Sequence, residues 1–296
     1  MDRSGLAKVG IDIGGTKIAL GLVSAKNTVI GKIRRFEVAP FNEAGKLVDH
    51  LVSECEQLIS DHEYTPAQIE GIGIGTPGPL DLRTGTVLNT PNMPLFRGFG
   101  LKQAVQERTA WPVEVNNDAN VFVLGEALAG EAREGQIVIG VTLGTGYGCG
   151  IVLDKQIFVG ATGTAAEIAR CPYSDSILED YVSGRGLSRM YANRTHTTLD
   201  GQEIAQRAQA GEEAALEAFH EFGHHVGWSF AWFVSLLDPD FIVVGGSISK
   251  NWEYIHDGIH EALYDYINPQ PADHLQIVRS KLGESAAIIG AAGLLH

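Results

Sequence analysis

The sequence predicts an α/β protein built from two domains. At roughly 150 residues per domain, its 296 residues suggest two of them. Segments rich in Val, Ile and Gly alternate with segments whose apolar residues recur at helical spacing. The two halves open alike, because 9–23 and 137–153 both fit a strand, a glycine turn and a second strand. The two segments share residues of similar chemistry but few identical ones. We therefore suspect, from this likeness, that the hairpin is duplicated.

The first half contains further elements that alternation or helical spacing of apolar residues predicts. After the two strands of 9–23 come a helix over 45–61, a strand over 69–75, the Pro- and Gly-rich loop TPGPLD, a short helix over 101–108, the strand PVEV and a helix over 119–128. The loop is predicted because Pro and Gly interrupt both regular patterns there.

Helices dominate the second half. After the strands of 137–153 they are predicted over 175–192, 202–209, 212–237, 253–267 and 284–295, with strands over 241–246 and 275–278. No linker rich in Ser or Pro separates the halves. We therefore expect closely joined domains with a cleft between them.

Composition excludes several classes of protein. There are 22 Lys and Arg against 36 Asp and Glu, a formal net charge of −14, which disfavours binding to nucleic acid or to an anionic membrane. A nucleotide stays possible, because local backbone N–H groups and Mg²⁺ can hold a phosphate. No apolar run is long enough for a membrane span, and the N-terminus lacks a signal-peptide pattern. Three scattered cysteines fit a reducing cytoplasm.

Three glycine turns follow predicted strands. Glycine has no Cβ, so backbone N–H groups can approach a phosphate closely, and a carboxylate beside them can hold hydrated Mg²⁺. Each turn alone could be only a tight turn, but three of them in both halves favour a nucleotide held between two domains. The candidate residues are Asp12, Gly14, Gly15, Thr16 and Lys17, then Gly144, Thr145 and Gly146, then Gly245, Gly246 and Ser247.

Asn117 and Asp118 stand just before a predicted helix. Asp118 suits the N-cap of that helix, where its carboxylate would accept backbone N–H groups. It also suits a general base, because the helix dipole would keep the carboxylate ionised and able to accept a hydroxyl proton. Asn92, Glu167 and Glu179 are hydrogen-bonding side chains of the kind that a sugar needs, although each would also suit the surface.

Two other motifs are weaker. The run GIGTPG over 73–78 matches the dinucleotide pattern G-x-G-x-x-G, but Pro77 and Pro79 disfavour the helix that this pattern needs. His220, Glu221 and His224 match the H-E-x-x-H signature of zinc peptidases on a predicted helix. The longer form of that signature needs a third His where Phe230 stands. A polar histidine face on a packed helix is therefore favoured over a zinc peptidase.

These residues together resemble the ROK family (repressor, open reading frame, kinase) of sugar kinases. Five segments between Val9 and Leu295 carry the resemblance, in family order: IDIGGTK, GTPG, NNDAN, GTG and LDPDFIVVGG. The resemblance implies the actin/hexokinase-like ATPase fold, which is ribonuclease H-like, with a cleft between two α/β domains. It also implies that the C-terminal helix returns to the first domain. We expect a small N-terminal domain of 1–118 plus 283–296 and a larger C-terminal domain of 119–282.

The resemblance also implies a function and a role for each matching residue. It implies an ATP-dependent hexose kinase of the cytoplasm, with glucose as the default substrate, the 6-hydroxyl as acceptor and a homodimer as the assembly. Asp118 matches the catalytic base. The glycine turns would hold ATP, and Asp12 would hold Mg²⁺ through water. The residues that would bind the sugar are Gly78, Asn92, Asn117, Asp118, Glu167, Arg170 and Glu179.

One segment departs from the family pattern. The family has a His followed by a cysteine cluster for structural zinc, whereas this chain has Arg170 and then only Cys171. We therefore expect no structural zinc, and we expect Arg170 to touch a sugar hydroxyl or to pair with Glu167 or Glu179. Two other hypotheses stay open, a catalytically silent sugar-binding protein and a sugar-responsive regulator of the same family. The regulator would need a DNA-binding domain, for which we expect no room before Val9.

Overall fold

The computed structural model describes residues 5–90 and 93–295, and it divides into two compact units. Unit 1 comprises 1–134, 150–165 and 282–296, and unit 2 comprises 135–149 and 166–281. The expected return of the C-terminal helix to the N-terminal part of the chain is thus found, since 282–296 belongs to unit 1. None of the described helices is long and apolar enough to cross a membrane.

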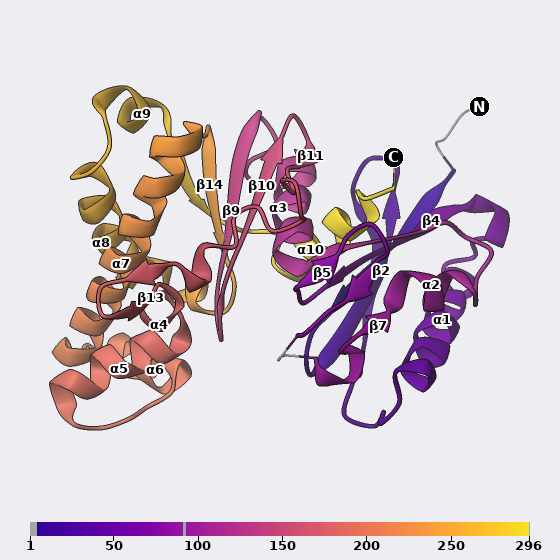
Figure 1. The fold of residues 1–296 in the computed structure, drawn as a ribbon, viewed down its shortest axis with the longest axis horizontal. Helices are drawn as coiled ribbons and strands as arrows, with labels where there is room; N and C mark the ends of the chain where they lie inside the picture. The colour runs from indigo at the N-terminus through magenta and orange to yellow at the C-terminus, as the bar shows by residue number, and fades with distance from the viewer. Residues whose placement is uncertain (1–4, 91–92, 296) are drawn as a thin grey trace. The chain divides into compact units, whose positions relative to one another are not determined.

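A five-stranded sheet forms the centre of unit 1 (Figure 1). Its strand order is β3-β2-β1-β4-β8, with β1 to β3 antiparallel and β4 and β8 parallel to β1. The strands are β1 (Ala7–Ile13), β2 (Lys17–Ser24), β3 (Val29–Glu37), β4 (Ile69–Thr76) and β8 (Val113–Asn117). A small sheet of β5 (Leu80–Asp81), β6 (Thr86–Val87) and β7 (Phe99–Gly100) accompanies it. The remaining elements are α1 (Ala44–Asp61), η1 (Pro66–Gln68), η2 (Pro94–Phe96), α2 (Leu101–Gln106), α3 (Asp118–Ala129) and α10 (Glu284–Ala292).

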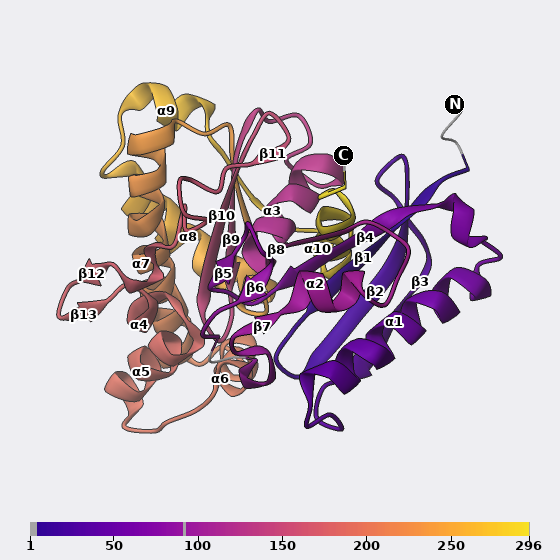
Figure 2. The same ribbon diagram turned by 45° about the vertical axis from the view of Figure 1, so that its right-hand side comes forward.

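The two faces of this sheet follow from the period of two in its strands. Large apolar residues of β1 and β2 share one buried cluster with the apolar stripe of α1. On β2, the intervening residues Ala19 and Val23 pack instead with Ile288, Ile289 and Ala292 of α10. Smaller side chains on this second face let α10 approach the sheet closely. Figure 2 shows α1 and α10 against the same sheet.

A second five-stranded sheet repeats this order. Its strand order is β11-β10-β9-β14-β15. In each sheet the first strand in sequence (β1 or β9) is central, with the next two strands in sequence on one side of it and two later strands on the other. β14 pairs in parallel with both β9 and β15. This repeat supports the duplication suspected from the sequence. The strands are β9 (Ile137–Leu143), β10 (Tyr147–Leu153), β11 (Gln156–Ile157), β14 (Phe241–Gly245) and β15 (Gln276–Arg279).

Helices make up most of the rest of unit 2. They are η3 (Ile168–Arg170), α4 (Glu179–Val182), α5 (Gly184–Thr195), α6 (Gly201–Gln209), α7 (Glu213–Leu237), η4 (Ile248–Asn251), α8 (Trp252–Tyr264) and α9 (Pro269–His274). A hairpin of β12 (Pro172–Tyr173) and β13 (Ser176–Ile177) stands before α4.

One expected helix was wrong, and the prediction lacked β3 and several shorter elements, α9 among them. The single helix expected over 175–192 begins instead with β13, and α4 and α5 are separate helices with Ser183 between them in an extended conformation. Apolar spacing hid the break, because the two helices together keep one buried face. β3 was missed altogether. It is an edge strand with Lys32, Arg34 and Arg35 on it, so its polar sequence lacks the alternation that marks an inner strand.

Candidate active site

The turn between β1 and β2 carries the first set of predicted phosphate-binding residues. The Gly14 N–H donates to the Lys17 carbonyl oxygen over 2.9 Å and closes the turn. Gly15, Thr16 and Lys17 are exposed. The Lys17 ammonium lies 3.1 Å from a carboxylate oxygen of Glu284, and Arg35 pairs with the same carboxylate. α10 therefore holds the lysine of this turn through its first residue.

Asp12, near the end of β1, lies within electrostatic reach of Asp118. Burial raises the pKa of Asp12 to about 7, and the negative charges of Asp118 and Glu284 add to this effect while Lys17 opposes it. The strand pairing explains why Asp12 and Asp118 lie near each other. Asp12 of β1 stands opposite Gly75 of β4. β8, which leads into Asp118, pairs with the other edge of β4. The structure thus brings together two carboxylates that are far apart in the sequence.

The start of α3 differs from the expectation for Asp118. Asn117 is the N-cap, since its Oδ1 accepts from the N–H groups of Ala119 and Asn120 at 2.9 and 3.4 Å. Asp118 is the first helical residue, and its Oδ1 accepts from the Ala119 N–H at 2.8 Å. The pKa of Asp118 is raised because burial outweighs that hydrogen bond. The N–H groups at the helix start do act to lower this pKa, but burial has the larger effect, so the net shift is opposite to the one expected from the sequence.

The predicted sugar-binding residues of unit 1 lie partly in one place. A Cβ built on Gly78 would stand 2.9 Å from Nδ2 of Asn117, so the GTPG loop passes directly over the asparagine. Asn117 and Asp118 are both partly buried and adjoin this loop. Asn92 lies outside the described residues.

Asn116 is a neighbouring residue that the sequence reasoning missed. Its Oδ1 accepts from the N–H of Asn117 at 2.8 Å and from Nδ2 of Asn120 at 2.9 Å, so it ties the end of β8 to the first turn of α3. The signal was present, because three asparagines fall within the NNDAN run. In the structure the side chains of Asn116 and Asn120 are hydrogen-bonded to each other, and Asn117 is the N-cap of α3.

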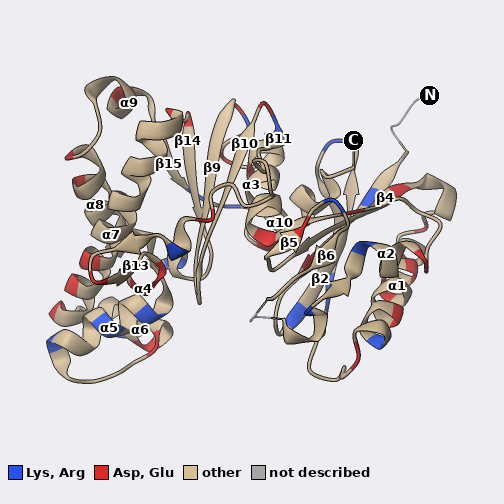
Figure 3. Cartoon of the chain, viewed as in Figure 1, with Lys and Arg blue, Asp and Glu red and all other residues tan. Residues whose placement is uncertain are grey.

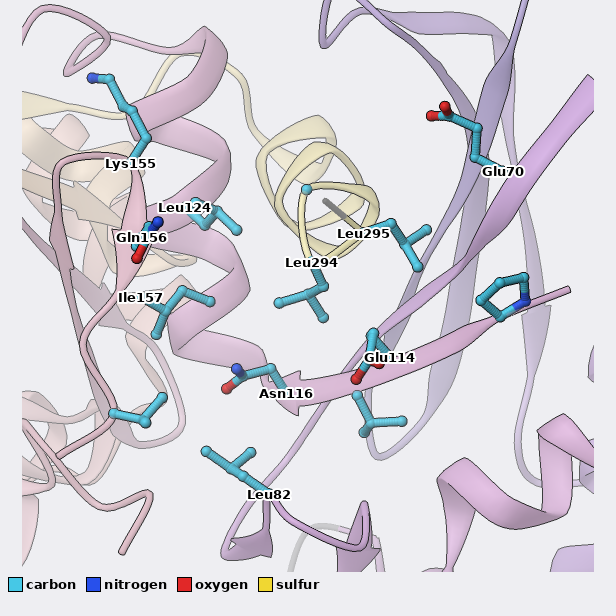
Figure 4. Close-up of a pocket in the computed structure, with 14 residues that line it drawn as sticks. Glu70, Leu82, Glu114, Asn116, Leu124, Lys155, Gln156, Ile157, Leu294 and Leu295 are labelled. Carbon is cyan, nitrogen blue, oxygen red and sulfur yellow. The ribbon is translucent and has the colours of Figure 1, made fainter. Parts of the chain in front are cut away.

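Asn116 also borders a pocket of about 820 Å³ in unit 1. Figure 4 shows its amide pointing from the end of β8 into this pocket, opposite Ile157, with Leu82 and Leu294 nearby. None of the predicted site residues is among the described residues that line it. The pocket is thus separate from the groups around Asp118, although Asn116 connects the two.

In unit 2 the two remaining glycine turns lie side by side. A Cβ on Gly144 would stand 3.5 Å from Oγ of Ser247, and the Gly144 carbonyl accepts from the Gly184 N–H at 2.8 Å. Gly246 has a φ of +84°, and a Cβ there would overlap the backbone of Leu143. Only glycine tolerates both the positive φ and the close approach to the Leu143 backbone. Gly246 therefore allows the two turns to lie this close together.

The two turns border a pocket of about 1170 Å³ that lies wholly within unit 2. Gly144, Thr145 and Ser247 line it. Basic side chains that the sequence reasoning missed also line it, namely Arg185, Arg189 and Lys250. The two arginines belong to α5, whose basic residues Figure 3 shows in blue. A pocket with backbone turns on one side and guanidinium groups on another suits a phosphorylated ligand.

Glu179 is the better anchored of the two predicted glutamates. Its carboxylate accepts from the Tyr147 N–H at 3.3 Å and pairs with Arg185 at 3.0 Å. Glu167 is exposed, yet its charge helps to raise the pKa of buried Cys149, after burial itself. Arg170 is exposed, and the described ion-pair partner of Glu179 is Arg185. A pairing of Arg170 with Glu167, or a contact of Arg170 with a sugar, stays a prediction.

Comparison with known proteins shows the family. A family model described as the ROK family matches residues 8–296. This chain belongs to the ROK family. Among curated ROK relatives, the glucokinase of Thermotoga maritima is 29% identical, with 98% of this chain and 97% of that protein covered. The N-acetyl-D-glucosamine kinase of Photobacterium profundum is 31% identical, with 96% and 98% covered.

A solved ROK structure extends this likeness to the fold. A ROK family glucokinase from Streptomyces griseus, in complex with glucose and AMPPNP, matches this chain with a TM-score of 0.80 at 30% identity. The match covers 98% of this chain and 99% of that one. The predicted actin/hexokinase-like ATPase fold is confirmed.

The H-E-x-x-H segment of this ROK protein lies on α7, and its residues have other partners. His220 lies 3.1 Å from Glu261 of α8, and Glu221 pairs with Arg194 at 2.5 Å. His225 and Arg194 lower the pKa of Glu221 to about 2. Gly223 stands where any Cβ would overlap the backbone of α8, so it serves helix packing. The face of α7 is accordingly structural, as favoured from the sequence.

Replacing both His220 and His224 with alanine should leave the catalytic rate unchanged. His220 loses only a surface ion pair with Glu261, worth about 1 kcal/mol or less. The measurement is the steady-state rate of sugar phosphorylation beside an assay for casein cleavage. Chelator-sensitive cleavage of casein by the parent protein would contradict this reading of α7.

Proposed function

We propose that this protein is an ATP-dependent kinase that phosphorylates a hexose, glucose foremost, on its 6-hydroxyl. The observation that carries the proposal is the arrangement at the start of α3, where Asn117 caps the helix and Asp118 holds a partly buried carboxyl beside Asp12. The names of the ROK relatives support the kinase activity, and the glucose complex supports the choice of sugar.

Asp118 would act as the general base. In the proposed reaction the sugar hydroxyl gives its proton to the Asp118 carboxylate, while its oxygen bonds to the γ-phosphorus and the bond from that phosphorus to ADP breaks. A carboxyl whose pKa is raised by burial binds a proton more readily than an ordinary one, which suits this role. Its Oδ1 accepts the Ala119 N–H, which helps to orient the carboxylate.

The residues proposed to bind the sugar carry amide, carboxylate, guanidinium and backbone groups. In unit 1 these are Gly78, Asn92 and Asn117, and in unit 2 they are Glu167, Arg170 and Glu179. Carboxylates and amides suit a hexose because each can accept or donate to the hydroxyl groups of its ring. Glu179 is already oriented by Tyr147 and Arg185, so its free lone pairs point in a fixed direction.

ATP would be bound by the glycine turns. In unit 2 the nucleotide would take the pocket beside Gly144, Thr145, Gly146 and the Gly245–Ser247 turn, where Arg185, Arg189 and Lys250 offset its charge. In unit 1 the turn of Gly14 to Lys17 offers backbone N–H groups of the kind that bind phosphate.

The carboxylate of Asp12 fits a hydrated Mg²⁺ ion. The ion prefers oxygen ligands and keeps several waters, and a divalent cation would relieve the repulsion that raises the pKa of Asp12. Bound there, Mg²⁺ would neutralise charge on the transferred phosphoryl group. From the resemblance we also expect a homodimer that works in the cytoplasm.

A panel of sugars tests the proposed function. With ATP and Mg²⁺, glucose should give the highest kcat/KM among glucose, mannose, fructose, N-acetylglucosamine and N-acetylmannosamine, and NMR of the product should show a 6-phosphate. ADP should form only when sugar is present. A higher kcat/KM for an N-acetyl sugar would overturn the choice of glucose, and the absence of sugar-dependent ADP would overturn the kinase.

A further inference from the structure

The segment that joins Glu167 to Glu179 forms an ordered hairpin. β12 and β13 pair Pro172 with Ile177 and Tyr173 with Ser176. At the base of the hairpin the Leu178 N–H donates to the Cys171 carbonyl over 3.0 Å. Glu179 therefore follows this hydrogen-bonded unit directly, Glu167 precedes it by the short helix η3, and the hairpin makes up most of the path between them.

Aromatic rings anchor this hairpin to α7. The Tyr173 ring lies 4.5 Å from that of Trp228 and 4.9 Å from that of Tyr181, measured between centroids. The Tyr173 hydroxyl is 2.7 Å from Nδ1 of His225. We call Tyr173, Tyr181, His225 and Trp228 the aromatic brace. Figure 2 shows the hairpin beside α4 and α7, the two helices that carry the other three rings.

The aromatic brace is itself supported on two sides. The His225 ring faces Glu221 at 3.8 Å, and Arg194 holds that glutamate in turn. Arg189 stands over the Tyr181 ring, with its guanidinium carbon 4.3 Å from the centroid. Burial raises the pKa of Tyr173 to about 12, so its hydroxyl stays neutral and keeps its hydrogen bond over the whole physiological range. The rings of Tyr173, Tyr181 and His225 are thus held by a polar group as well as by packing.

A structural zinc, which the family resemblance implies at this segment, does not fit these residues. Such a site takes four Cys or His ligands. Between Glu167 and Glu179 the chain offers Cys171 alone, and the nearby Nδ1 of His225 already meets the Tyr173 hydroxyl.

We propose that the aromatic brace takes the place of a metal, and that Tyr173 and His225 are positioning residues that set Glu167 and Glu179 toward the sugar. The inference rests on the proposed function, because it assigns these glutamates to a sugar. It predicts that loosening the brace weakens sugar binding while leaving ATP binding alone.

The decisive variant is Tyr173→Phe, which keeps the ring and removes only the hydroxyl that meets His225. The KM for glucose should rise on the order of 3- to 10-fold, the change expected for one hydrogen bond. The KM for ATP and kcat should stay within about twofold of the parent. Adding His225→Ala to Tyr173→Phe should raise the KM no further than the larger single effect, because both remove the same contact. The matched control is Tyr254→Phe, on α8 against Phe219, which should change none of these constants.

Hydrogen exchange tests the brace without using catalysis. In Tyr173→Ala, backbone amides of 171–181 should exchange about tenfold faster, while those of α7 and α8 keep the parental rates. Exchange in the parent should be the same with and without EDTA. Faster exchange over the whole of unit 2, or faster exchange of the parent in EDTA, would overturn the brace.

A third variant separates failure of this inference from failure of the proposed function. Glu179→Gln should raise the KM for glucose. If it does so while Tyr173→Phe and Tyr173→Ala leave that KM unchanged, the proposed function stands and the positioning role is overturned. If Glu179→Gln leaves the KM unchanged, the assigned sugar site fails and the positioning role falls with it.

Discussion

Asp118→Asn should lower kcat by about 100-fold or more, while the affinity for sugar changes little. An amide has nearly the shape of a carboxylate, and its oxygen can still accept the Ala119 N–H that Asp118 accepts at 2.8 Å. The helix start should survive, since Asn117 and not Asp118 is the N-cap. An amide cannot take up the hydroxyl proton, so the loss should fall on the chemical step.

Steady-state kinetics and calorimetric titration with glucose together check this expectation. Asp273→Asn is a suitable control, because it makes the same chemical change on an exposed face of α9. A kcat near that of the parent for Asp118→Asn would remove Asp118 from the role of base. A large loss of sugar affinity with unchanged kcat would instead make it a binding residue.

Gly290→Val should destabilise the protein by roughly 3 kcal/mol, at the upper end of what overpacking costs. A Cβ on Gly290 of α10 would stand 2.6 Å from the carbonyl carbon of Val121 and 2.8 Å from the amide nitrogen of Gly125, both in α3. A backbone cannot rotate away as a side chain can, so the two helices must separate.

Gly290→Ala gives a sharper test, because two effects oppose each other. Alanine is preferred over glycine inside a helix by about 1 kcal/mol, so propensity alone predicts a more stable protein. The overlap with α3 predicts a less stable one, and we expect the overlap to prevail. Gly100→Ala, where no atom lies within 4 Å of the added Cβ, is the matched control and should change little. Urea unfolding followed by circular dichroism measures all three variants; a Gly290→Ala protein at least as stable as the parent would contradict the packing argument.

Much of the fold could be predicted because strands and helices here carry strong local signals. The helices over 45–61, 202–209 and 212–237 follow from apolar spacing, and the structure confirms each within about one residue. The likeness of 9–23 to 137–153 anticipated two sheets of the same order. β3 escaped because an exposed edge strand needs no apolar alternation.

The site was harder to predict, since its geometry depends on contacts between distant segments. The sequence suggested Asp118 as the N-cap of α3, whereas the N-cap is Asn117. The two assignments differ by one residue at a helix start, and sequence patterns rarely locate a helix start that accurately. Arg185, the described ion-pair partner of Glu179, lies at the start of α5, and the break before that helix was not visible in the apolar pattern. The hairpin of β12 and β13 has only two residues in each strand, too few for any periodicity.

The pairing of Lys17 with Glu284 joins residues 267 positions apart, and this has a consequence for biosynthesis. The strands of the unit 1 sheet precede most of unit 2 in the chain, yet α10, which covers one face of that sheet and packs against the helix bearing Asp118, follows unit 2. Domains generally fold in the order in which they leave the ribosome. Here unit 1 leaves the ribosome first, but it cannot complete its fold before residues 282–296 have been made. The nascent chain must carry an uncovered sheet face until residues 284–292 are synthesised, so the proposed catalytic carboxylate reaches its final surroundings only after the whole of unit 2 has been made.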